Sequence, residues 1–185
     1  MVIEDGKGKS GNMSVSAAQR GNVSSKSKNR LFYISRDDGL AFNAIMPSFN
    51  AVAGNYVFYV KNTASDKNMY INHIEFHSVE AAVWKVFQVT GTAAAGTAIT
   101  AVNLNLGSGR PAESTIMGGG ATITGLTVGN QIGTHRTTAL SESEMDWGGG
   151  LILSPNTAIM VEYDTGTTGL IEIDCLVHFE TIGRT

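Results

Sequence analysis

Residues 170–180, LIEIDCLVHFE, alternate between apolar and polar side chains with a period of two. In a β-strand this period places successive side chains on opposite faces. One face carries Ile171, Ile173, Cys175, Val177 and Phe179, and the other carries Glu172, Asp174, Leu176, His178 and Glu180. We expect the first face to pack in a core and the second to meet water.

A second strand is predicted just before this one. The run TAIMVEYD (157–164) is rich in β-branched and aromatic residues, and DTGTTG (164–169) supplies turn residues between the two runs. Two such strands separated by a short loop containing glycine are typical of a β-hairpin. The sequence therefore predicts that they pair as neighbours in one antiparallel sheet.

The same period continues upstream through most of the chain. Short segments rich in apolar, β-branched and aromatic residues are separated by polar turns, with no helical segment between them, which favours antiparallel pairing. The predicted strands begin with LFYIS at Leu31 and continue at 40–46, 55–62, 68–78, 82–89, 98–106, 114–117 and 121–127. The rest of residues 107–150 is predicted to form long loops, because glycine and polar residues dominate it.

Length and composition agree with one all-β domain over residues 31–185. Twenty-two glycines among 185 residues, with 42% hydrophobic and only 16% charged residues, fit a turn-rich β-protein. The single cysteine, Cys175, cannot form an intrachain disulfide, and the alternation predicts that it is a small buried hydrophobe.

Residues 1–30 differ in composition from the rest of the chain. They contain no aromatic residue and no apolar periodicity, so they cannot offset the entropy of ordering by burying a surface of their own. They carry six Lys or Arg against two acids, a net charge of +4, whereas residues 31–185 have a net charge of −7. We predict a flexible basic N-terminal arm that binds a partner through Lys7, Lys9, Arg20, Lys26, Lys28 and Arg30.

Two other interpretations of this arm are disfavoured. Gly8, Lys9 and Ser10 match the end of a Walker A loop, but the first glycine of that loop would fall at Ile3, and no buried strand precedes it. The cations could neutralise phosphates, but the arm has no aromatic residue to stack on bases and the body is acidic. We therefore expect acidic protein surfaces as partners, with no specific nucleic acid.

Histidine and carboxylate side chains suggest possible metal sites. His73, Glu75 and His77 share one face of a predicted strand and could ligate zinc or nickel, but the spacing is not that of cupin jelly rolls. The three acids of SESEMDW, in a predicted loop at 141–147, offer oxygen ligands for calcium without the spacing of an EF-hand. Solvent-facing polar residues are the favoured interpretation of both groups, and no cofactor is predicted.

No catalytic pattern is found. Asp174 and His178 share a strand face, but the chain has no G-x-S-x-G nucleophile elbow, so we predict that it is not an enzyme. Trp84 is predicted to fill the core or an interface, whereas Trp147, beside glycines, could stack on a sugar or lie at a subunit contact. No apolar run is long enough to predict a membrane span.

The series of strands with glycine-rich loops, ending in LILSPNTAIMVEY (151–163) and IEIDCLVHFE (171–180), resembles small jelly-roll virion proteins of tailed bacteriophages. These include capsid decoration or cement proteins, and the resemblance covers roughly residues 31–181. It implies an antiparallel jelly-roll β-sandwich and a non-enzymatic protein that stabilises the assembled head by bridging capsid subunits. A tail or vertex accessory protein and a carbohydrate-binding host-attachment module are the alternatives.

The resemblance also implies partners and a location. The partners would be the major capsid protein or other virion proteins, and the protein would be made in the bacterial host cytoplasm and incorporated into the virion. A homotrimer is expected, because decoration proteins of this kind commonly stand at three-fold positions. Alternation places apolar Met160 and Leu176 on outward faces, which makes them candidates for the subunit interface.

Overall fold

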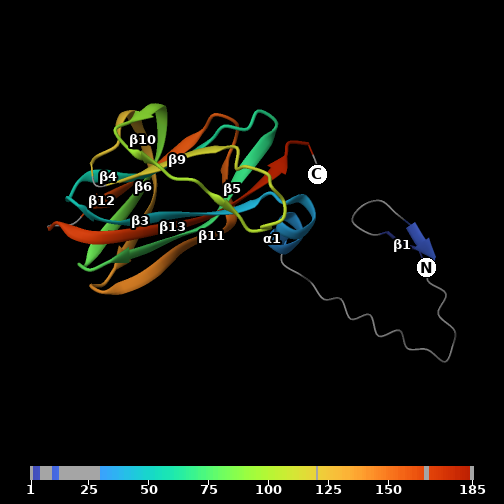
Figure 1. Cartoon of the computed structure of the whole chain (residues 1–185), viewed down its shortest axis with the longest axis horizontal. Helices are drawn as coiled ribbons and strands as arrows, with labels where there is room; N and C mark the ends of the chain where they lie inside the picture. Colours follow the sequence, from blue (N-terminus) through green and yellow to red (C-terminus); the bar gives the residue numbers. More distant parts are fainter. Residues whose placement is uncertain (1, 5–9, 13–29, 120, 165–166, 184–185) are drawn as a thin grey trace.

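The structure is a computed structural model, and it describes residues 2–4, 10–12, 30–119, 121–164 and 167–183. Two antiparallel sheets pack against each other and enclose one main hydrophobic core, so the predicted all-β sandwich is confirmed (Figure 1). In the described part of the chain, no helix has the length and apolar character needed to cross a membrane.

Each sheet is described by the order in which its strands pair. The six-stranded sheet has the order β10 (Thr124–Thr137), β6 (Ala82–Ala94), β12 (Ala158–Asp164), β4 (Asn55–Asn62), β9 (Ser114–Gly118) and β7 (Thr97–Ala98). The five-stranded sheet has the order β11 (Ser141–Leu153), β5 (Lys67–Ser78), β13 (Gly169–Thr181), β3 (Ala41–Ala51) and β8 (Val102–Asn103). Two short strands near the N-terminus, β1 (Val2–Glu4) and β2 (Ser10–Asn12), form a separate antiparallel pair.

The core lies between the sheets and confirms the alternation of the last strand. All five residues predicted to face inward on β13, including Cys175 and Phe179, are buried, and burial raises the pKa of the Cys175 thiol. Trp84 on β6 is also buried, as predicted. Its ring stacks on Phe76 with centroids 4.7 Å apart, and its Nε1–H donates to Thr137 Oγ1 over 3.1 Å.

The predicted hairpin between residues 157–164 and 170–180 is wrong. β12 lies between β6 and β4 in one sheet, whereas β13 lies between β5 and β3 in the other. Both strands are central and use both edges for pairing within their own sheets. The turn-forming sequence between them therefore leads the chain from one sheet to the other.

The predicted strand at Leu31 is also wrong, because the chain is helical there. A short helix α1 (Arg30–Tyr33) continues into a π-helical turn (Ile34–Asp38) that ends at Gly39, whose φ of 61° is left-handed. Ile34 is buried, while the guanidinium of Arg36 lies over the rings of Phe32 and Tyr33. A helical turn allows Ile34 to be buried while Arg36 covers the two rings. Glycine readily adopts the left-handed conformation that ends such a turn.

The predicted strand at 98–106 is reduced to the two-residue strands β7 and β8. The side chain of Asn103 explains part of this difference, because its Nδ2 donates to the carbonyl oxygens of Gly39 and Arg110. Its Oδ1 accepts a hydrogen bond from the backbone N–H of Asn105. Asparagine side chains that satisfy backbone groups in this way favour turns over strands.

The long loops predicted within residues 107–150 are instead mostly strand. β10 and β11 are among the longest strands in the structure, and they form the outer edges of the two sheets on the same side of the sandwich. β10 pairs with β6 through several register shifts, which accommodate its glycines. The glycines thus mark irregularities within a strand.

Met160 is fully buried, so its predicted exposure is wrong. It lies on the outer face of the six-stranded sheet, where it packs in a second small cluster with Tyr59, Val89 and Ile123. The segment after β9 covers this face, because the N–H of Ile123 donates to the carbonyl of Tyr56 over 2.9 Å. Alternation gives the correct face, but a covering segment removes that face from water.

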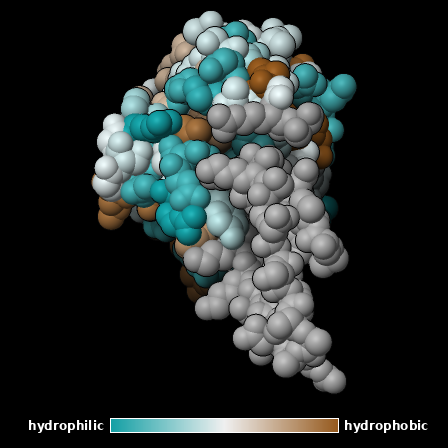
Figure 2. All heavy atoms as spheres, turned by 90° about the vertical axis from the view of Figure 1, so that its right-hand side faces the viewer, coloured by the Kyte–Doolittle hydropathy of each residue, from teal (hydrophilic) through white to brown (hydrophobic). Residues whose placement is uncertain are grey.

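Most of the predicted basic arm lies outside the described residues, including Lys7, Lys9, Arg20, Lys26 and Lys28. The backbone of Arg30 begins α1, which lies at one end of the sandwich (Figure 1). The surface at this end is mixed, with many hydrophilic residues and scattered hydrophobic ones among those described (Figure 2).

Candidate binding face on the five-stranded sheet

Three neighbouring strands of the five-stranded sheet bring carboxylates and histidines together on their outer face. β5 lies between β11 and β13, and antiparallel pairing aligns their outward residues in three rows. The rows are Glu142–His77–Glu172, Glu144–Glu75–Asp174 and Asp146–His73–Leu176. We call this surface the carboxylate face.

The middle row places three acids side by side. Glu75 is directly opposite Glu144 on one side and Asp174 on the other. Side chains directly opposite each other lie about 4.5–5.5 Å apart at Cβ, and like charges in such pairs destabilise a sheet. Burial and the charge of Glu172 raise the pKa of Asp174, against the opposing effect of His73. Opposed like charges of this kind are unfavourable for a folded sheet unless a positive charge lies against them.

A small hollow is centred on this surface. It has a volume of about 90 Å³, and its lining is almost wholly acidic: Glu75, Glu142, Glu172 and Asp174, with His77. The Nδ1 atom of His77 is buried and has no hydrogen-bond partner among the described residues. The negative charge of this lining is complementary to a small positively charged group.

A larger hollow of about 530 Å³ adjoins the Asp146 end of the face. Its lining includes Leu31 of α1, Asp146 of β11, and Tyr70, His178 and Glu180 of β5 and β13. The rings of Tyr70 and His178 are stacked with centroids 4.8 Å apart. Carboxylates beside an aromatic pair form an environment that suits a lysine or arginine head group.

A β-bulge at Asn72 builds this end of the face. The register between β13 and β5 passes from Val177–Ile71 to Leu176–His73, which leaves Asn72 as the extra residue. Asn72 Nδ2 donates to His178 Nδ1 over 3.0 Å, so His178 Nε2 carries the proton shared with Glu180 Oε1 at 3.1 Å. His178 is consequently only 4% exposed, and its predicted position in water is wrong.

The two groups of candidate metal ligands, for which the solvent-facing interpretation is favoured, do not converge on a site. Among the described residues, no group of three or more His, Cys, Asp or Glu side chains is arranged to hold a metal ion. His73, Glu75 and His77 follow one another along β5, where same-face residues are spaced by about 6.6–6.8 Å. The predicted loop at 141–147 is part of β11, and its acids likewise point outward in sequence along a strand.

The structure does not bring Asp174 and His178 together as a catalytic pair. They are four residues apart along β13, and His178 bonds Asn72 and Glu180 instead. A different histidine contacts a serine: His135 Nε2 is 2.9 Å from Ser143 Oγ, between the edge strands of the two sheets. Burial lowers the pKa of His135, and its ring stacks on Phe76. Through these contacts the His135–Ser143 pair links the two sheets.

Trp147 packs against the main core from β11. It is half-buried, and so it does not provide the freely exposed ring on which the carbohydrate interpretation depended.

The stacked Tyr70 and His178 pair was not predicted from the sequence, because the bulge at Asn72 is what places Tyr70 on the outer face together with His73.

Comparisons with protein-family models, with curated proteins and with solved structures each give no match to this chain. The interpretation of the carboxylate face therefore depends on its own geometry.

Acidity is expected to affect stability through Asp174. The pKa of Asp174 is raised in the folded state, so the folded state binds this proton more tightly than the unfolded state does. The stability that comes from this difference is present at low pH and is lost as pH rises through the folded pKa. Relative to Asp174→Asn, the free energy of unfolding of the wild type should fall as pH rises from about 4 toward neutrality. Urea unfolding of both proteins across this range measures the difference, and a difference independent of pH would contradict the assignment.

Proposed function

We propose that the protein is a non-enzymatic structural protein that binds other proteins through its charged surfaces. The observation that carries the proposal is the row of Glu144, Glu75 and Asp174, placed side by side on a rigid sheet. Like charges placed opposite each other on a sheet are unfavourable unless a positively charged group lies against them. A partner with a cationic surface would relieve the repulsion and gain affinity and orientation from it.

We further propose that the sandwich is a jelly roll. When the short strands β7, β8 and β9 are left aside, the eight long strands pair in the order β3-β13-β5-β11 in one sheet and β4-β12-β6-β10 in the other. Connections that pass between the sheets at β3 to β4, β4 to β5, β5 to β6 and β12 to β13 support this topology. The jelly roll is a common architecture of viral capsid proteins.

In this proposal the protein decorates a bacteriophage head and reinforces it. The support for a place in the virion is the resemblance of the sequence to small jelly-roll virion proteins. A protein that binds only the assembled shell stabilises it by mass action. The basic arm and the carboxylate face would contact capsid surfaces of opposite charge, and a place on the tail or at a vertex would use the same surfaces.

A homotrimer is part of the proposal, with a revised interface. Leu176 remains a candidate, because it is half-buried beside an apolar part of the outer face. The register continues from Leu176 through Asn43 to Val102, and from Asp174 to Ile45. Ile45 is 59% exposed and Val102 is 54% exposed, so these residues replace the buried Met160 as candidates for subunit contacts.

Particles assembled with and without this protein test the proposal. We expect cryo-electron microscopy to show density for three copies around three-fold positions of the head, and heads that lack the protein to release DNA at a lower temperature. Triple neutralisation by Glu75→Gln, Glu144→Gln and Asp174→Asn should lower occupancy, whereas Glu80→Gln, at an exposed residue outside the face, should not. Density on the tail or a vertex would favour the accessory role, and absence from the particles would refute a place in the virion.

A further inference from the structure

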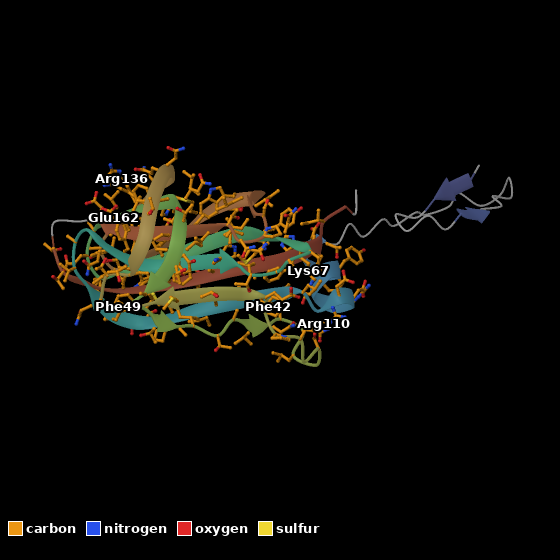
Figure 3. The ribbon with its side chains drawn as sticks, turned by 90° about the horizontal axis from the view of Figure 1, so that it is seen from above. Phe42, Phe49, Lys67, Arg110, Arg136 and Glu162 are labelled. Carbon is orange, nitrogen blue, oxygen red and sulfur yellow. The ribbon has the colours of Figure 1, made fainter. Side chains whose placement is uncertain are left out.

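The carboxylate face has almost no compensating positive charge within its own sheet. β11, β5 and β13 together contain seven Asp or Glu residues and one cation, Lys67. Lys67 lies at the start of β5 and is already paired, with its Nζ 2.7 Å from Glu113 and 3.1 Å from Asp66. Figure 3 shows Lys67 and Arg110 near the α1 end of the sandwich and Arg136 toward the other end.

The basic segment of the chain joins the body beside this face. Leu31 lines the larger hollow together with Asp146 and Glu180, and Arg30 begins α1 immediately before it. Lys28 and Lys26 precede Leu31 by three and five residues. Even a fully extended chain spans at most about 3.6 Å per residue, so these two lysines stay within about 11 Å and 18 Å of Leu31.

The spacing of these cations matches that of the acidic rows. Lys26 and Lys28 are separated by Ser27, so an extended segment ahead of α1 would present both lysines on one side, ~6.6–6.8 Å apart. The acids of β11 at 142, 144 and 146 repeat at the same interval, because they too are two residues apart on a strand. Charge and repeat are therefore both complementary.

We propose that residues 26–29, which precede α1, dock on the carboxylate face of their own chain. Lys28 contacts the row of Glu144, Glu75 and Asp174, and Lys26 reaches the row that contains Glu142 and Glu172. Attachment at Leu31 favours the same chain over a second copy, since a short tether gives an effective concentration in the millimolar range. This inference does not depend on a place in the virion, but it implies that capsid binding by the arm competes with docking on the protein's own face.

Paramagnetic relaxation in the full-length protein tests the docking. A nitroxide attached at Ser24→Cys lies two residues beyond Lys26, and the native thiol of Cys175 is buried and resists labelling. We expect loss of amide signal at residues 142–144 and 172–174, and recovery of that signal at 0.5 M salt, where the screening length is only a few ångströms.

Matched variants separate docking from mere tethering. Lys26→Glu with Lys28→Glu keeps the tether and reverses the charge, so the signal loss at residues 142–144 should disappear. Neutralising Glu75, Glu144 and Asp174 should abolish it as well, while Glu80→Gln should leave it unchanged. Signal loss that persists in the charge-reversed variant would overturn the proposal.

A mixed sample identifies which chain supplies the segment. Isotope-labelled protein without nitroxide is combined with unlabelled protein that carries it, at micromolar concentration. Signal loss in the isotope-labelled chains would show docking by a second copy and overturn docking within one chain. Association with phage heads is measured separately, so a failure of docking and a failure of the virion proposal remain distinguishable.

Discussion

Phe179→Ala is expected to lower the free energy of unfolding by about 3–5 kcal/mol, the range typical of a large aromatic residue removed from a core. Phe179 is buried at the inner face of β13, and its ring meets that of Phe42 edge to face with centroids 5.7 Å apart. These two rings belong to neighbouring strands of one sheet and face the opposite sheet. The truncation therefore removes apolar burial and leaves a cavity between the layers.

Glu172→Ala, on the outer face of the same strand, is the matched control. Glu172 is exposed, so its replacement should change the free energy of unfolding by no more than about 0.5 kcal/mol. Urea titrations of both variants, followed by tryptophan fluorescence, measure the two values. A similar loss in both variants would show that β13 does not separate a core face from an outer face.

The sequence predicts the faces of strands better than their partners. Alternation along β13 correctly identifies Ile171, Ile173 and Val177 as core residues, because each decision depends on local periodicity. The choice of partner strand depends on contacts distant in sequence, which is why the turn signal at 164–169 suggests a hairpin that does not form. The burial of Met160 is hidden for the same reason, since Ile123 covers it from another part of the chain.

The carboxylate face could be predicted only in parts. The pattern of alternating acids in SESEMD is the same strand signal as that in IEIDCL, and it could have identified β11 despite the glycines that follow. Sequence cannot show that β11 and β13 lie on either side of β5, because these pairings join segments that are distant in the chain. It also cannot reveal the bulge at Asn72, which turns Tyr70 toward His178.

Asn62 is a further feature that has no sequence signal. It ends β4 in the six-stranded sheet and is completely buried. Its Nδ2 donates to the carbonyl oxygens of Lys67 and Leu153, both at 2.8 Å, and its Oδ1 accepts from the N–H of Ala64 at 2.9 Å. Because Lys67 begins β5 and Leu153 ends β11, this one side chain ties the two sheets together.

Asn62→Ala is expected to lower the free energy of unfolding by on the order of 3 kcal/mol, because a buried polar group left without its partner costs about 1–3 kcal/mol. Three backbone groups lose a partner here, because alanine offers neither the amide donor nor the oxygen acceptor of asparagine. Asn50→Ala, at an exposed position on β3, is the matched control and should have a small effect. Urea unfolding compares the two variants. A loss in Asn62→Ala no larger than that in Asn50→Ala would show that other groups satisfy these backbone atoms and that Asn62 does not hold the two sheets together.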